Sequence, residues 1–133
     1  ERDDLAHASL EGVFEEFHAT GSNAWPLEMF ADMLEQLVTG QLLSPASMRR
    51  LLDHMRAARP AGGGIEDGLP SGTDFAAASG TGFQRACQAG VLGAADPGQA
   101  TIVVACIRDF GEPENAGRAL QAVGRALSRA GLA

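Results

Sequence analysis

The chain has 133 residues and a formal net charge of -7, and all ten of its basic residues are arginines. This length fits one domain that buries roughly two thirds of the surface its unfolded chain would expose. Nucleic acids and anionic membranes are bound through clustered Lys and Arg, whereas these arginines are scattered, so we expect neither partner. No segment approaches the roughly 20 apolar residues that a membrane span requires.

The absence of two residue types excludes whole reaction classes. The sequence contains no lysine and no tyrosine, so this chain alone cannot supply an amine or a phenolate as base, nucleophile or Schiff-base former. We expect no cofactor. The first residues, "ERDDLAHASL", have neither the basic start nor the apolar core of a signal peptide, and composition leaves the compartment open.

Helical periodicity predicts four helices. The first covers residues 3–18, the second begins at Pro26 and ends at Gly40, and the third begins at Ser44-Pro45 and ends before Pro60. The fourth begins at Pro113. Its apolar stripe consists of Ala116, Ala119, Leu120, Val123, Ala126 and Leu127.

Between the third and fourth helices the pattern changes to strands. Residues 61–74, "AGGGIEDGLPSGTD", contain six Gly or Pro in fourteen positions and predict a flexible loop without a regular element, mobile at residues 62–64. Strands are predicted over residues 75–79, 86–93 and 101–107. The third, "TIVVACI", is apolar almost throughout, which predicts burial on both faces. The whole, residues 1–133, is therefore expected to be one α+β domain with a three-stranded antiparallel sheet.

Two sets of residues are candidates for specific chemistry. Cys87 and Cys106 fall nearly opposite each other across the predicted hairpin, so they either form a disulfide or are two small buried apolar residues. On the first predicted helix a carboxylate and histidine stripe has ligand spacing, but such a stripe is far more often a solvated surface, and we expect no metal site. Its members are Asp4, His7, Glu11, Glu15 and His18.

Several short motifs in a fixed order resemble the C-terminal half of class A β-lactamases, which are penicillin-recognising serine hydrolases. They are the helix pair "PLEMFADMLEQLVTGQLLSPASMRRLLDHM", the turn "GLPSG", the box "SGTGFQ" and the closing helix "ENAGRALQAVGRAL". The resemblance covers about residues 21–133. It implies that Ser79, Gly80, Thr81 and Gly82 form the edge of a substrate site, with the Thr81 amide as an oxyanion donor. The plainer alternative is a strand edge where glycine permits close packing.

The departures from that family are equally specific. Ala78 stands where the family's Lys-Thr-Gly box has its lysine, and the Ser-x-x-Lys nucleophile motif has no counterpart. The isolated chain is therefore expected to be inactive. A Cys–His pair would need His7, His18 or His54, all on predicted helices remote from the hairpin.

The resemblance also implies partners. The family's N-terminal strands and helical domain are missing, so residues 101–107 should lie at an open sheet edge covered by a second polypeptide or by self-association. Three hypotheses follow: a portion of a β-lactamase-like hydrolase, a non-catalytic binding module, or a self-sufficient domain whose first helix covers the edge. A β-lactam or small carboxylate is the expected ligand, and the family implies a bacterial exported, periplasmic or extracellular location.

Overall fold

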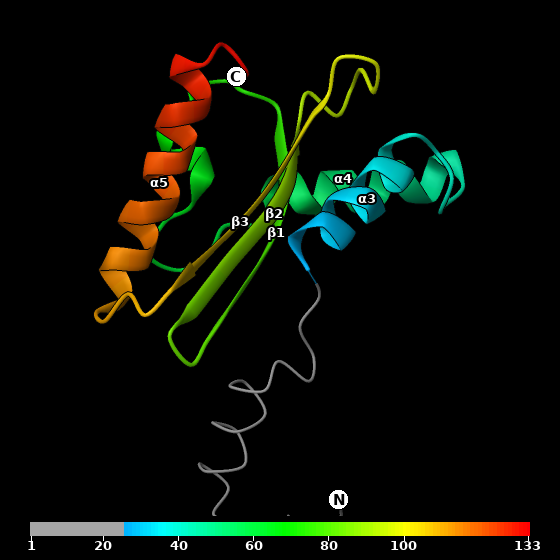
Figure 1. Ribbon diagram of the computed structural model, residues 1–133. Helices are drawn as coiled ribbons and strands as arrows, with labels where there is room; N and C mark the ends of the chain where they lie inside the picture. Colours follow the sequence, from blue (N-terminus) through cyan, green and yellow to red (C-terminus); the bar gives the residue numbers. More distant parts are fainter. Residues whose placement is uncertain (1–25) are drawn as a thin grey trace, which may run out of the picture.

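The computed structural model describes residues 26–133, so the predicted helix over residues 3–18, with its carboxylate and histidine stripe, lies outside the described residues. A three-stranded sheet separates two helical layers (Figure 1). Helices α3 (Leu27–Val38) and α4 (Pro45–Ala57) cover one face, and α5 (Pro113–Arg129) with the short 3-10 helix η1 (Ile65–Gly68) covers the other. The prediction of an α+β fold is confirmed.

Local signals fix the bounds of the first two helices. Pro26 immediately precedes α3, and Gly40, with a φ of 80°, follows its end. Ser44 is the N-cap of α4: its side chain accepts a hydrogen bond from the Ser47 amide at 3.3 Å, and Pro45 occupies the first turn. Both helices therefore lie where the sequence predicted them.

The sheet is an antiparallel meander in the order β1 (Phe75–Gly82), β2 (Arg85–Leu92) and β3 (Thr101–Arg108). Strand β1 continues three residues beyond the predicted end because Gly82 pairs with Arg85 across a two-residue turn. Phe83 and Gln84 form this turn with φ of 46° and 59°. Such a turn usually contains Asn-Gly, so it carried no recognisable sequence signal.

Each face of the sheet has its own apolar core. On the α3 and α4 side, Leu34, Leu37 and Leu52 pack against Ala76 and Val91 of the sheet. On the α5 side the cluster consists of Ile65, Phe75, Ala77, Leu92, Val103 and Leu120. Side chains of successive strand residues point to opposite faces, and this alternation divides the apolar residues between the two cores.

Strand β3 corrects one prediction. We expected "TIVVACI" to be buried on both faces, but only Val103 is buried and Cys106 is exposed. No described strand pairs with the outer edge of β3. Both faces of β3 nevertheless contact a core: Ile102 and Val104 pack against the α3 and α4 cluster, and Ala105 and Ile107 pack against the α5 cluster. The partial exposure of the strand reflects its position at the edge of the sheet within residues 26–133.

Residues 61–74 contain a regular element after all. The helix η1 lies at their centre, and Ile65 is completely buried beneath α5. The contact is close because it joins glycines: a Cβ on Gly117 would overlap the Gly62 carbonyl oxygen, and a Cβ on Gly124 would overlap that of Ile65. The α5 stripe is therefore wrong at Ala126, which is exposed, while these two glycines are buried.

One ion pair connects α4 to the sheet. Arg56 donates from Nε to Asp74 Oδ1 at 2.6 Å and from Nη2 to Asp74 Oδ2 at 3.3 Å. Asp74 directly precedes β1 and also accepts from the Ala95 amide at 3.3 Å, beyond the end of β2. The hydrogen bonds from Arg56 lower the pKa of Asp74 below its usual range.

The close packing of α5 predicts that a glycine-to-alanine substitution in this helix destabilises the protein, which is the opposite of the usual effect. Replacing an exposed helical glycine by alanine stabilises a helix by about 1 kcal/mol. Gly117→Ala should instead lower the free energy of unfolding by about 2 kcal/mol, because its methyl group has no room against Gly62.

Urea denaturation would measure this effect, with Ala122→Gly on the exposed side of α5 as the matched control. Ala122→Gly should lower the free energy of unfolding by about 1 kcal/mol, since only helix propensity acts at this position. An unchanged or increased stability of Gly117→Ala would contradict the packing described.

The Asp74 carboxylate should contribute to acid sensitivity. Because its folded pKa is lowered, its contribution is present above the unfolded pKa of about 4 and is lost as the pH falls through the folded value. We expect Asp74→Asn to cost about 1 kcal/mol at pH 7, a small value because both partners are about one-third exposed. The cost should shrink in denaturation curves recorded below about pH 4. A loss of equal size under those acidic conditions would mean that charge has no part in it.

Candidate functional site

The box predicted from the sequence occupies the end of β1. Across β2, Ser79 pairs with Gln88 and Thr81 with Ala86. Their side chains lie on the α5 face, because Gln88 contacts the segment beneath α5 and Ala77, two residues earlier, belongs to that core. Ala78 and Gly80 alternate to the opposite face and are exposed. Ala78, which stands at the lysine position of the resembling box, thus lies on one face of β1. The Ser79 and Thr81 hydroxyls lie on the other face.

The backbone of β1 has hydrogen-bonding groups directed away from the sheet. In an antiparallel pair, alternate residues direct both N–H and C=O toward the partner strand, and those between direct both away. The Gly93 amide donates to the Asp74 carbonyl at 2.8 Å. Asp74 and Gly93 are therefore a hydrogen-bonded pair. Every second pair along the register is hydrogen-bonded in the same way, and Gly80 with Cys87 is one of these pairs. The Thr81 N–H therefore points outward, at an edge that no described strand covers.

A cleft of about 320 Å³ adjoins this end of β1 on the α5 side. Ser79, Thr81 and Gly82 line it together with the Phe83-Gln84 turn, the Pro60-Ala61 segment and the first turns of α5. Gln84 closes one end, since its side-chain amide exchanges hydrogen bonds of 2.9 and 2.7 Å with the backbone of Gly111. The predicted site residues are thus brought to one cavity, apart from Gly80, which does not line it.

Close packing within residues 26–133 does not account for the two glycines of the box. If Gly80 and Gly82 were needed for close packing, a Cβ at either position would meet neighbouring atoms, but nothing lies within 4 Å of it among the described residues. In this part of the chain the edge is open. Room is therefore available on the face of β1 that Ala78 and Gly80 occupy.

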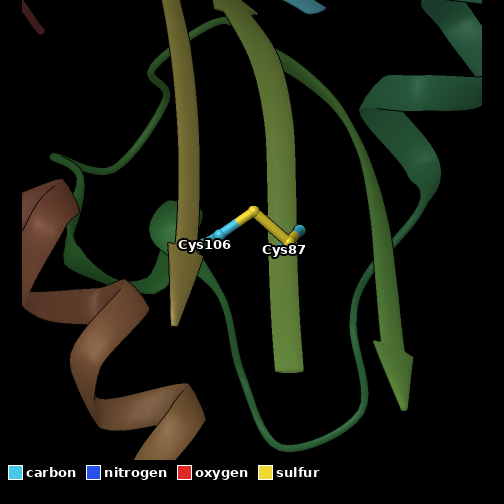
Figure 2. The surroundings of a disulfide bond; sticks show 2 residues. All are labelled: Cys87 and Cys106. Carbon is cyan, nitrogen blue, oxygen red and sulfur yellow. A yellow bond between two sulfur atoms is a disulfide. The ribbon is translucent and has the colours of Figure 1, made fainter. Parts of the chain in front are cut away.

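Cys87 and Cys106 form a disulfide between β2 and β3 (Figure 2). The two residues are directly paired in the sheet register, with their Cα atoms 4.1 Å apart. This settles the alternative left open by the sequence, and it leaves no free cysteine among the described residues. The disulfide lies on the face of Ala78 and Gly80, where Arg85 and Arg108 are also paired.

A buried polar group beneath α5 was not anticipated. Gln88 is 1% exposed and is the buried polar residue of the described chain. Its Oε1 accepts from the Ile65 amide at 2.8 Å and its Nε2 donates to Glu66 Oε2 at 2.7 Å. The other oxygen, Glu66 Oε1, is buried without a hydrogen bond and lies 3.8 Å from Arg59 Nε. Gln88 thus fixes η1 against the sheet. The only sequence signal was a glutamine inside a strand.

None of the remaining candidates within the described residues lines the cleft. His54 is exposed on α4, and His7 and His18 lie outside the described residues. Within residues 26–133, no group of three or more metal-ligating side chains occurs, and no helix is long and apolar enough to cross a membrane. Within residues 26–133, the polar groups beside the cleft are the Ser79 and Thr81 hydroxyls, the Gln84 amide and backbone amides.

Comparison with known proteins identifies the family of this chain. The model of the beta-lactamase enzyme family matches residues 5–130. The chain thus belongs to the beta-lactamase enzyme family. No match was found among curated proteins.

Solved structures agree with the family. A reconstructed class A β-lactamase of the last common ancestor of Gram-negative bacteria is 28% identical, with a TM-score of 0.64 over 75% of this chain. PBP-A is 26% identical, with a TM-score of 0.61 over 76%. A variant of PBP-A has been captured as an acyl-enzyme with penicillin G. The chain spans only 39% and 37% of the length of the ancestral β-lactamase and of PBP-A, respectively.

The disulfide should be a major source of stability. It closes a loop between residues separated by 19 positions, and loops of this size are stabilised by about 3 kcal/mol. We expect the double variant Cys87→Ala/Cys106→Ala to unfold at lower urea concentration than the wild type. Reductant should destabilise the wild type to a similar extent and leave the variant unchanged. Two titratable thiols in the untreated, denatured protein would contradict the disulfide.

Proposed function

We propose that this chain is the C-terminal portion of a β-lactamase-like serine hydrolase that acts on β-lactams or related amides and is incomplete by itself. The observation that carries this is the outward Thr81 N–H beside a cleft lined by the Ser79 and Thr81 hydroxyls. An N–H in this position can stabilise the oxyanion of acyl transfer, and removing one such donor typically costs a factor of about 100 to 1,000 in kcat. An oxyanion donor without a nucleophile does not catalyse.

The missing groups define what must complete the site. The chain has no lysine, and Ala78 presents a methyl group where a cation would be expected. A second polypeptide or a further segment would supply the serine nucleophile and its lysine. Its nucleophile would lie beside Thr81 at the edge of β1. The same polypeptide or segment would also cover the opposite edge of the sheet, because β3 is an apolar edge strand with no strand partner within residues 26–133, and such an edge is normally covered.

A second candidate is a non-catalytic binding module. The observation that favours it is Ala78 itself, since a chain selected for catalysis would be expected to retain the cation. In that case the open edge of β3 would pair with a second copy or another partner, and the cleft would bind a ligand without turnover. Acylation of the protein in its native assembly separates the two candidates.

The isolated chain should not react with penicillin G. Incubation followed by intact mass spectrometry is expected to show the unmodified mass, because no activated nucleophile is present. A stoichiometric penicilloyl adduct on this chain would contradict the proposal. Native mass spectrometry of the protein from its source should reveal Ser-x-x-Lys, either on a second polypeptide or on a further segment of a longer chain. A chain that is always found alone or with copies of itself would favour the binding module.

Restoring the cation should not restore catalysis. Ala78→Lys places an amine on the exposed face opposite the Ser79 and Thr81 hydroxyls, with no serine nucleophile beside it among the described residues. We expect no hydrolysis of a chromogenic β-lactam above the buffer rate, with the wild-type chain as control. Measurable turnover by this single variant would reveal a nucleophile that the proposal does not include.

A further inference from the structure

The disulfide between β2 and β3 lies where the described helices leave the sheet uncovered. Helices α3 and α4 pack on this face against Ala89 and Val104, the next pair along the two strands on the same side of the sheet. At the disulfide itself, Cys87 is half-buried and Cys106 is exposed. Within residues 26–133, Cys106 is therefore accessible to a reagent in solution.

Glycines occupy the β1 side of the disulfide. Gly80 is the residue of β1 that pairs with Cys87, and a Cβ at Gly80 would meet no atom of the described residues within 4 Å. The same is true of Gly82, which pairs with Arg85. On the other side, β3 has no strand partner within residues 26–133. Because thiol–disulfide exchange requires access to a sulfur atom, this arrangement favours such exchange.

Two arginines stand beside the disulfide on the same face of the sheet. Arg85 and Arg108 pair directly across the strands, each two residues from a cysteine, which is about 7 Å along a strand. Neither forms an ion pair within residues 26–133, although Asp109 follows Arg108 in the sequence. Like charges directly opposite each other in a sheet are unfavourable. An anion bound beside the disulfide would relieve this repulsion.

From these positions we propose that the disulfide is an exchange site for small thiols that carry a carboxylate, and that the thiol becomes bound to Cys106. Arg108, beside Cys106, attracts the carboxylate, and Arg85, beside Cys87, stabilises the thiolate that leaves. This modification goes beyond the proposed hydrolase function and does not depend on it.

The exchange consumes one thiolate and forms another. The sulfur of the reagent attacks the Cys106 sulfur, the bond between the two cysteines breaks, and its electron pair leaves on the Cys87 sulfur, which then takes a proton from water. The reagent is oxidised to a mixed disulfide, and Cys87 is reduced to a thiol. Attack by Cys87 on the mixed disulfide reverses the step, so the product must be trapped to be observed.

The charge of the two arginines sets the size of the preference. Attraction between unit charges about 7 Å apart in water corresponds to a factor of about three in a rate constant. Two arginines should therefore favour a thiolate with one added carboxylate about fivefold at low ionic strength, where screening is weak. In about 1 M salt, with a Debye length of about 3 Å, the preference should fall below about twofold.

The test compares two thiols of similar size, 3-mercaptopropionate and the uncharged 2-mercaptoethanol. The full 133-residue chain is incubated with each, portions are quenched with iodoacetamide, and intact masses give the rate per unit concentration of thiolate. At low ionic strength 3-mercaptopropionate should react about fivefold faster. Tandem mass spectrometry should locate the reagent on Cys106 and the carbamidomethyl group on Cys87.

Denaturant separates exchange in the folded chain from exchange after unfolding. The rates should be unchanged in about 0.5 M urea, because the disulfide is accessible without unfolding. Exchange that requires global unfolding would instead accelerate severalfold under these conditions.

Removal of the two cations checks the electrostatic cause. Arg85→Gln/Arg108→Gln should slow both thiolates, and 3-mercaptopropionate the more, so that the preference falls below about twofold. This variant should remain folded because it removes a like-charge pair. Arg125→Gln/Arg129→Gln, exposed on α5 at the opposite face of the sheet, removes the same charge and should keep the wild-type rates.

Several results would overturn the inference. They are equal rate constants for the two thiolates at low ionic strength, a preference that persists without Arg85 and Arg108, a reagent group located on Cys87, or exchange that occurs only when the chain unfolds. None of these results bears on hydrolysis, which acylation of the protein in its native assembly tests.

Discussion

The register of the central strand β2 determines how the rest of the molecule is arranged. This strand is hydrogen-bonded to β1 on one side and to β3 on the other, and each of its residues therefore has a fixed neighbour and a fixed face. A shift of one residue would exchange every side chain between the two faces. Gln88 would then leave the buried position where it binds Ile65 and Glu66, and Cys87 would no longer be aligned with Cys106.

The same register separates the functional features onto two faces and one edge. The hydroxyls of Ser79 and Thr81 lie on the α5 face, where the segment before η1 and the first turns of α5 complete the cleft. The disulfide, the Arg85 and Arg108 pair and Ala78 lie on the other face, beyond the part that α3 and α4 cover. The Thr81 amide points along neither face but out of the edge of β1. A completing polypeptide could therefore approach the exposed face and the edge without displacing the described core.

The wall of the cleft depends on close backbone packing more than on apolar side chains. Gly117 and Gly124 allow α5 to approach the segment that contains Gly62 and Ile65, and Gln88 satisfies the Ile65 amide from below. A buried amide of this kind is favourable only when its partners are in place. The contacts of Gly117 and Gly124 and the Gln88 hydrogen bond thus hold α5, η1 and the sheet together.

Local signals were enough to predict the helix starts and the class of the fold. The Ser44-Pro45 cap and Pro113 act on neighbouring backbone atoms alone, and the lack of lysine limits the chemistry in any conformation. The folded structure was needed for every contact between distant segments. It orders η1 under α5, buries Gly117 while Ala126 is exposed, joins the two cysteines and turns the hydroxyls of the box toward the cleft. These features depend on strand register and on packing between elements far apart in the chain, which residue periodicity does not encode.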